Sequence, residues 1–216
     1  MPDLFFETKA KHRDTLRPLA DRIRPNSLHE IVGQEHILHE GSLLRKMITT
    51  DTLRSVIFWG PPGTGKTTLA NVIANETNWN FIACNASAIG VKDIREIIAE
   101  ARSQIEHAES RTIVFLDEIH RFHKGQQDVL LEAVEQGILI LIGATTENPA
   151  YSVNNALMSR STIFQLEPLN EDDIKSVISR AIQSPKGYQS LNLDISHEVI
   201  SFWAKVSDGD ARRALN

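Results

Sequence analysis

The segment from Gly60 to Thr68, GPPGTGKTT, satisfies the pattern G-x-x-x-x-G-K-[ST] of a phosphate-binding loop. Glycines let successive backbone N–H groups turn toward one anion, and a helix starting near Lys66 would add the positive end of its dipole. The Lys66 ammonium can reach β- and γ-phosphates, and the Thr67 hydroxyl can bind Mg²⁺. The sequence therefore predicts a site for ATP and magnesium. Its loop residues are Gly60, Pro61, Pro62, Gly63, Thr64, Gly65, Lys66, Thr67 and Thr68.

Two adjacent carboxylates follow an apolar run over residues 113–116. An acid at the end of a buried strand is costly to desolvate unless it faces a cation, so Asp117 is predicted beside Mg²⁺. Glu118 is predicted to orient or deprotonate an attacking water, which favours hydrolysis over phosphoryl transfer to a small acceptor. The alternative is that Asp117 only caps the next helix. The phosphate-binding loop about 50 residues upstream favours the catalytic interpretation.

These groups need a scaffold of strands and helices that alternate along the chain. Such alternation predicts crossover connections and a doubly wound α/β sandwich, a P-loop NTPase fold with a parallel five-stranded sheet between helices. Short apolar runs predict strands at residues 55–59, 81–84, 112–116, 138–144 and 162–166. Helical spacing predicts helices at residues 67–78, 91–107 and 126–136.

The strands stop after Pro168, and the rest of the chain is predicted to be helical. Polar caps and acidic first turns predict helices at residues 170–183 and 196–207, with another starting at Asp208 or Gly209. The expected organisation is an arm over residues 1–17, a nucleotide-binding domain over 18–168 and the start of a helical lid, truncated, over 169–216.

The bulk composition is that of an ordinary folded domain. Hydrophobic residues make up 41% of the 216 residues and charged residues 24%. No run approaches the roughly 18 apolar residues of a membrane span, which predicts an untargeted cytoplasmic protein. The net charge of −5 argues against an extensive basic surface, so any DNA contact is expected to be local. The single cysteine, Cys84, is predicted to be a small buried hydrophobe.

The segments GPPGTGKTT, FLDEIHRF and GATTENP, in this order and spacing, resemble the AAA+ superfamily. The opening PLADRIRP with Val32-Gly33-Gln34, and the closing GDARRALN, narrow the resemblance to the clamp-loader-like branch. The most similar family within it is that of replication-associated recombination protein A, which is related to the eukaryotic Werner-helicase-interacting ATPase. The resemblance covers residues 18–216 almost without a gap.

The resemblance also implies functional residues. Thr145 or Thr146 would be the sensor of the γ-phosphate, with Asn148 a third candidate. Arg160 would be an arginine finger that reaches a neighbouring subunit, although this chain has Ser161 where the family usually has Cys; a surface ion pair is the commoner fate of an arginine. Arg212 matches the lid arginine. Asn85 matches the polar residue that restrains the catalytic glutamate until DNA binds.

For other residues a functional role and an ordinary structural role are both open. In the resembling fold Arg24, Pro25, Val32 and Gly33 would line the adenine pocket, whereas their spacing alone favours an ordinary turn. Lys92, Arg95 and Arg102 fall near one face of the helix at residues 91–107, where clamp loaders face DNA, but a solvated charged face is the more frequent meaning. His120 and His123 lack metal-ligand partners, so packing or solvated histidines are expected.

The resemblance implies an oligomeric, DNA-stimulated ATPase that maintains replication forks and acts in recombination and repair. The expected partners are DNA with single-strand/double-strand junctions, further copies of the chain, a single-strand-binding protein and the replisome, in the cytoplasm at the nucleoid. In this family the lid and an oligomerisation domain continue beyond residue 216. The alternatives are a clamp-loader subunit, a Holliday-junction branch-migration motor, a nucleotide-dependent binding switch and a small-molecule kinase.

Overall fold

The computed structural model describes residues 17–77, 79–107 and 110–216. The chain divides into two compact units: Asn26–Glu167 forms one, and the residues up to Pro25 form the other together with Pro168–Asn216. The arm expected over residues 1–17 lies, apart from Arg17, outside the described residues. The division falls within a residue of the boundary expected at 168, but it groups residues 18–25 with the C-terminal helices.

A five-stranded sheet forms the centre of the unit Asn26–Glu167. Every paired strand is parallel, and the order is β2-β3-β4-β1-β5, which confirms the predicted fold class. Helices connect the strands, so each strand runs in the same direction and ends at the same edge. The strands are β1 (Val56–Trp59), β2 (Asn80–Asn85), β3 (Thr112–Asp117), β4 (Ile140–Thr145) and β5 (Thr162–Gln165).

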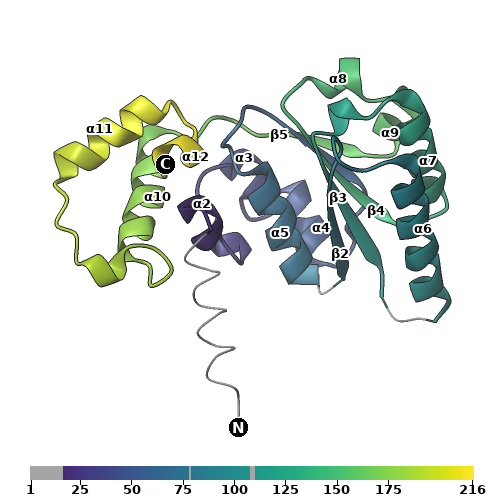
Figure 1. Ribbon diagram of the computed structural model, residues 1–216, viewed down its shortest axis with the longest axis horizontal. Helices are drawn as coiled ribbons and strands as arrows, with labels where there is room; N and C mark the ends of the chain where they lie inside the picture. The colour runs from purple at the N-terminus through teal and green to yellow at the C-terminus, as the bar shows by residue number, and fades with distance from the viewer. Residues whose placement is uncertain (1–16, 78, 108–109) are drawn as a thin grey trace, which may run out of the picture. The chain divides into compact units, whose positions relative to one another are not determined.

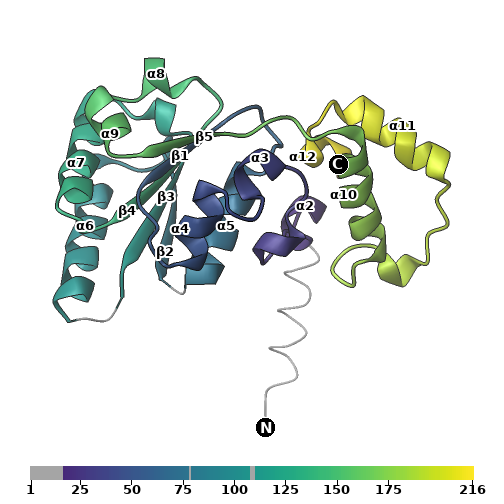
Figure 2. The same cartoon turned by 180° about the vertical axis from the view of Figure 1, so that it is seen from behind.

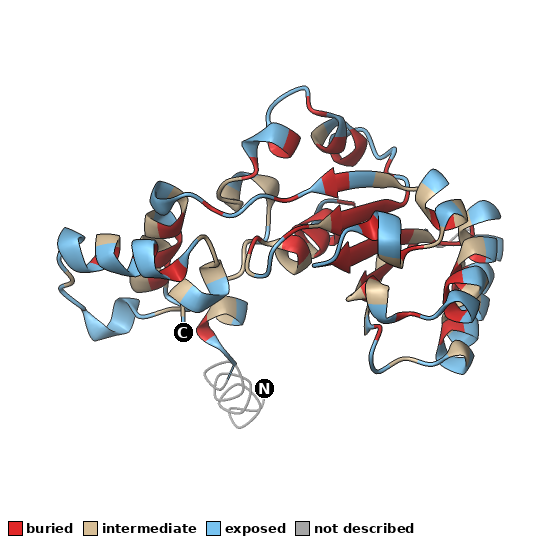
Figure 3. Cartoon of the chain, turned by 90° about the horizontal axis from the view of Figure 1, so that it is seen from above, coloured by how far each residue is buried: buried red, intermediate tan, exposed pale blue. Residues whose placement is uncertain are grey.

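Apolar side chains alternate between the two faces of this sheet. Val56 and Phe58 of β1 pack into one core cluster, and Ile57 between them packs into the other. Strands with both faces covered must be apolar throughout, which is why the sequence shows continuous apolar runs rather than alternation with polar residues. Figure 3 shows the inner strands largely buried and the helices around the sheet partly exposed.

Helices lie on both faces of the sheet, which makes a three-layer α/β/α sandwich (Figures 1 and 2). Residues of α4 (Leu43–Thr49) and α5 (Lys66–Thr77) belong to one core cluster, and residues of α6 (Val91–Glu106) and α7 (Lys124–Glu135) belong to the other. The short elements are η1 (Leu28–Glu30), α3 (Glu35–Leu38), η2 (Ile119–Arg121), α8 (Pro149–Ser152) and α9 (Asn155–Ser159).

The second unit is helical, as expected for residues 169–216. Its elements are α2 (Leu19–Arg22), α10 (Glu171–Gln183), η3 (Gln189–Leu191), α11 (His197–Ser207) and α12 (Ala211–Ala214). Leu19 and Ile23 pack with Ala181 and Leu215, which explains why residues 18–25 belong to this unit. Among the described residues no helix is both long enough and apolar enough to cross a membrane.

The ends of these helices follow from local capping. The Asn170 side chain accepts a hydrogen bond from the backbone N–H of Asp173, and Asp173 accepts one from the N–H of Asn170. The last helix begins at Ala211 rather than at 208 or 209, because Asp208 and Gly209 are left-handed, with φ of 53° and 75°.

Gly60 lies where β1 meets the carboxyl end of the neighbouring strand. Its φ is +153°, and a Cβ added there would lie 2.2 Å from the carbonyl oxygen of Leu166. Its N–H also donates to the carbonyl of Thr145, at 3.2 Å. Backbone therefore surrounds this position on two sides, and only glycine fits without moving a strand.

We predict that Gly60→Ala lowers the free energy of unfolding by about 3 kcal/mol, because the new methyl group overlaps a backbone atom that cannot rotate away. Gly41→Ala is the matched control, since Gly41 also has a positive φ, +89°, but a Cβ added there would meet no other atom within 4 Å. Its cost should be the conformational term alone, about 1 kcal/mol. Urea unfolding measures both, and equal losses would contradict the close approach at Gly60.

Candidate functional site

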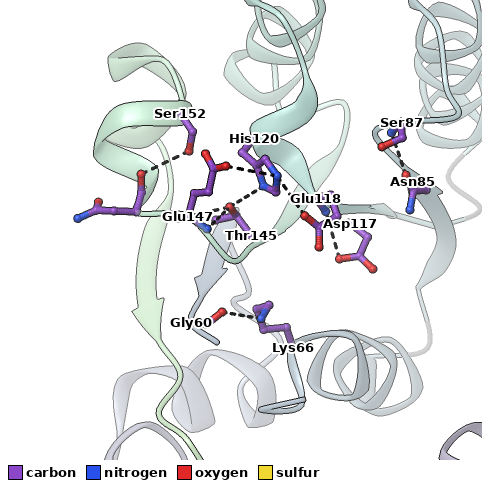
Figure 4. A network of polar contacts seen from close by, with 11 residues as sticks. Gly60, Lys66, Asn85, Ser87, Asp117, Glu118, His120, Thr145, Glu147 and Ser152 are labelled. Carbon is purple, nitrogen blue, oxygen red and sulfur yellow. Dashed lines mark hydrogen bonds and ion pairs between the residues drawn. The ribbon is translucent and has the colours of Figure 1, made fainter. Parts of the chain in front are cut away.

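The predicted phosphate-binding loop joins the carboxyl end of β1 to the start of α5. Gly63 and Gly65 have φ of 71° and 99°, values that glycine adopts readily, and the Thr64 hydroxyl donates to the carbonyl of Pro61 at 2.9 Å. The Lys66 ammonium donates to the carbonyl of Gly60 (Figure 4) and to that of Pro61, each at 2.7 Å. Lys66 is therefore held inside the loop, where an arriving phosphate would meet it.

Asp117 and Glu118 lie at the carboxyl end of β3, two strands from β1 in the sheet. Asp117 Oδ1 accepts a hydrogen bond from the N–H of Glu118, at 3.1 Å. Glu118 has a left-handed backbone, with φ of 57°, which costs a non-glycine residue about 1 kcal/mol. Strain of this kind clusters at functional sites and persists only where surrounding contacts hold it.

Thr145 ends β4, the strand between β3 and β1. Its side chain is fully buried, and its hydroxyl oxygen accepts the N–H of Glu147 at 3.0 Å. Thr146 is exposed. The Asn148 side chain accepts the N–H of Ala150 and caps α8. Of the three residues considered as γ-phosphate sensors, Thr145 is therefore the one whose side chain is fixed in the site.

His120 joins the carboxylate to this threonine. Its Nε2 lies 3.1 Å from Glu118 Oε2, and its Nδ1 lies 3.0 Å from Thr145 Oγ1 (Figure 4). The Glu147 carboxylate is farther away, with Oε1 3.8 Å from the same Nε2. Sequence reasoning expected only a packing or solvated histidine, and its position two residues after Glu118 was the available signal.

Gln34 is a second residue that sequence reasoning did not single out. It is buried, with a φ of 61°, and its amide donates to the carbonyl of Glu167 at 2.7 Å and accepts from the N–H of that residue at 3.0 Å. The same amide lies 3.4 Å from the carbonyl of Thr64. Gln34 thus braces the phosphate-binding loop against the segment that follows β5.

The donor set fits Mg²⁺ and a triphosphate. Thr67 offers a hydroxyl and Asp117 a carboxylate, the hard oxygen ligands that Mg²⁺ takes together with phosphates and water. The described residues contain no cluster of three or more His, Cys, Asp and Glu side chains that could hold a metal alone. A magnesium ion bound here would share the phosphates of the nucleotide.

Asn85 ends β2, beside Asp117 in the parallel register. In this structure its Oδ1 accepts the N–H of Ser87 at 2.8 Å, while the Glu118 carboxylate lies against His120 (Figure 4). The restraint that the resemblance implied between Asn85 and the glutamate is thus not the contact seen here. The side chain that contacts the Glu118 carboxylate in this structure is a histidine from η2.

Arg160 lies at the opposite edge of the sheet. It directly follows α9 and precedes β5 by two residues, and β5 pairs with β1 so that Thr162 lies beside Val56. Its guanidinium pairs with the Glu135 carboxylate and donates to the carbonyl of Ala156 at 3.0 Å. A cleft of about 730 Å³ opens here, lined also by Arg54 and Arg111.

The remaining predicted site residues divide between the two units. Arg24, which pairs with Asp21, and Pro25 and Arg212 belong to the helical unit, whereas Val32 and Gly33 belong to the α/β unit. Gly33 has a φ of 73° and lies in a bend just before α3. Arg212 lies on α12 and is exposed.

The charged face expected on α6 is solvated. Lys92, Arg95 and Arg102 are all exposed. Lys92 lies 3.7 Å from Glu96, and Arg102 donates to Gln136 at 3.0 Å. These contacts are typical of a surface helix and leave the face accessible to a partner.

Cys84 on β2 is partly buried. Burial, with a smaller contribution from the Asp93 carboxylate, raises the pKa of its thiol. The thiol therefore stays protonated near neutral pH and packs as a small apolar group. Since the thiolate is the nucleophilic form of cysteine, Cys84 is not a reactive nucleophile there. This agrees with the role expected from the sequence.

Comparison with known proteins agrees with this geometry. Residues 56–169 match the model of the ATPase family associated with various cellular activities (AAA). Replication-associated recombination protein A of Escherichia coli is 46% identical over 204 residues, which cover 94% of this chain and 45% of that protein. ATPase WRNIP1 of Dictyostelium discoideum is 42% identical over 211 residues, covering 98% of this chain and 24% of that protein.

A solved structure shares the fold. The RuvB Holliday junction branch migration motor of Thermotoga maritima superposes with a TM-score of 0.72 at 30% identity, over 90% of this chain and 63% of that one.

The chain spans less than half the length of the two curated relatives. The family model covers more than half of the chain, over the strands and loops that carry the site. The chain therefore belongs to the ATPase family associated with various cellular activities, the AAA family.

Proposed function

We propose that this chain binds ATP with Mg²⁺ at the carboxyl edge of the sheet and hydrolyses it to ADP and phosphate, in order to act on DNA at replication forks. One observation carries the proposal: Lys66, Asp117, Glu118 and Thr145 follow the ends of three neighbouring strands, β1, β3 and β4. Parallel strands bring such residues to one edge, where open α/β sheets bind ligands.

The chemistry assigned to these residues is in-line hydrolysis. A water attacks the γ-phosphorus, Glu118 accepts its proton, and the bond between the γ-phosphorus and the bridging oxygen of ADP breaks. Lys66 neutralises charge on the β- and γ-phosphates, and Mg²⁺ held by Thr67 and Asp117 would neutralise the rest. The adjacent pair Asp117-Glu118 favours hydrolysis over phosphoryl transfer to a small acceptor.

Thr145 is our candidate for the γ-phosphate sensor. Its hydroxyl is buried at the end of β4, and its carbonyl accepts the N–H of Gly60 at 3.2 Å, so its backbone is tied to the start of the phosphate-binding loop. Asn85, Arg212 and the adenine-pocket residues Arg24, Pro25, Val32 and Gly33 keep their proposed roles. Those roles rest on the family resemblance.

Arg160 is proposed to act on the nucleotide of a neighbouring subunit. The strands β1 and β5 run side by side, each four residues long, with the phosphate-binding loop beyond the carboxyl end and Arg160 before the amino end. A strand of that length spans about 13 Å, so Arg160 lies at the far edge of the sheet from its own phosphate-binding loop. An assembly that placed this edge against another copy's loop would complete the site.

The proposed DNA role comes from the relatives. Curated relatives, one of them 46% identical, carry names that refer to replication-associated recombination, and the exposed cations of α6 offer a local surface for phosphates. The proposal includes a homo-oligomer, single-strand/double-strand junctions, contact with a single-strand-binding protein and the replisome, and a cytoplasmic, nucleoid-associated location. The likeness to the branch migration motor favours a second candidate, a motor on four-way junctions.

We predict that phosphate release from Mg-ATP by the full-length protein rises severalfold with forked DNA carrying a single-strand/double-strand junction. Duplex DNA of equal length is the control for charge, and Lys66→Ala is the control for contaminating ATPases, because it lacks the loop cation. Stimulation by four-way junctions alone would favour the motor. Stimulation by none of these DNAs would contradict the proposed DNA role.

A subunit-mixing experiment tests the proposed trans action of Arg160. In the full-length protein Arg160→Ala and Lys66→Ala should each lose about 10³-fold or more in turnover, because the first lacks the charge donated to a neighbour and the second lacks its own loop cation. Mixed together, they should regain activity, because a mixed assembly pairs an intact loop with an intact Arg160. Wild-type turnover in Arg160→Ala, or a mixture as inactive as its components, would refute the assignment.

A further inference from the structure

The side chain of His120 lies between two residues of the proposed ATPase site. It comes from η2, one turn after β3, and its ring reaches the end of β4 (Figure 4). Only 10% of the side chain is exposed, and the Thr145 side chain that it contacts is fully buried. The ring is therefore fixed on both sides, which a packing histidine does not require.

The partners determine which ring nitrogen carries the hydrogen. An ionised carboxylate can only accept, so the nitrogen facing Glu118, Nε2, is assigned as the donor. In the neutral ring Nδ1 is then an acceptor, and the Thr145 hydroxyl donates to it. The hydroxyl oxygen in turn accepts the N–H of Glu147. The hydrogen bonds thus run in one direction, from the Glu147 backbone through Thr145 and His120 to Glu118.

We infer that His120 is a positioning residue that orients the Glu118 carboxylate. Because the ring is also hydrogen-bonded to Thr145, the hold of His120 on Glu118 depends on the state of the Thr145 hydroxyl. This rests on the proposed function, in which Glu118 takes the proton of the attacking water. Glu118 has a left-handed backbone and occupies the N-cap position of η2, but its carboxylate forms no capping hydrogen bond with that helix. Its direction is instead set by the 3.1 Å contact with His120.

The chain of bonds also provides a link to the nucleotide. A threonine hydroxyl has one hydrogen, which we assign to the bond with His120 Nδ1, at 3.0 Å, rather than to the more distant Glu147 carbonyl, at 3.3 Å. A γ-phosphate oxygen beside Thr145 competes for the same hydrogen. When the hydroxyl turns to the phosphate, His120 loses its donor and its hold on Glu118 loosens. ADP, which lacks that phosphate, leaves the chain of bonds intact.

Paired substitutions separate the two hydrogen bonds of His120. His120→Gln places an amide near the Nε2 position and keeps a donor for Glu118, whereas His120→Asn keeps only a polar group near Nδ1. Misplacing a catalytic group by about 1 Å costs roughly 10²-fold in rate. We therefore expect kcat to fall about 100-fold in His120→Asn and His120→Ala, to recover to within about tenfold of wild type in His120→Gln, and the KM for ATP to stay within about threefold.

The matched control is His123→Asn. His123 is exposed at the start of α7, and Asn preserves a favourable residue at that helix cap. Its kcat and KM should equal those of the wild type. Wild-type kcat in His120→Ala would overturn the inference. So would equal losses in Gln, Asn and Ala variants accompanied by weaker ATP binding, because they would show a residue needed only for packing.

A second measurement does not depend on turnover. Nitrogen NMR of ¹⁵N-histidine-labelled protein, with the His120 signal identified by its absence in His120→Gln, should show hydrogen on Nε2 and an accepting Nδ1. The Nδ1 signal should shift with a non-hydrolysable ATP analogue and with Thr145→Val, but not with ADP. An unchanged signal in both cases would overturn the link to the nucleotide. Failure of the wild type to bind ATP in calorimetry would overturn the proposed function as well, so the two failures are distinguishable.

Discussion

Parallel pairing of β3, β4 and β1 is the constraint on which the rest of the molecule depends. It brings the ends of three strands to one edge, so that a loop, a pair of carboxylates and a threonine far apart in the sequence become neighbours. The same pairing sends Arg160 to the other edge, because it precedes β5 rather than following it. One register therefore determines which residues the site contains and places Arg160 at the edge away from it.

The sequence predicts those parts of the fold in which local chemistry and tertiary structure agree. Strands covered on both faces must be continuous apolar runs, so the sequence predicts all five strands. Glycines are needed at positions 63 and 65 because the phosphate-binding loop has a left-handed backbone there. Asn170 and its acidic first turn predicted the start of α10, since the cap is a contact within four residues. Where the deciding interaction is local, the sequence is sufficient.

The rest depended on contacts between distant segments. Spacing could not separate Thr145 from Thr146, because the two differ in burial: Thr145 is fully buried, whereas Thr146 is exposed. The contacts of His120 could not be predicted from the sequence, because its partner Thr145 lies 25 positions away. The ring makes them only because the fold places it between two strand ends. Residues 18–25 joined the helical unit through Leu19 and Ile23, whose partners lie more than 150 positions later.

The central claim is that the carboxyl edge binds Mg-ATP and that Glu118 takes the proton of the attacking water. Glu118→Gln tests it most directly, because the amide keeps the size and polar contacts of the side chain but removes the base. Phosphorus NMR of the protein-bound nucleotide, after hours of incubation with Mg-ATP, should show intact ATP in this variant and ADP in the wild type. Wild-type conversion to ADP in Glu118→Gln, or loss of ATP binding, would contradict the account.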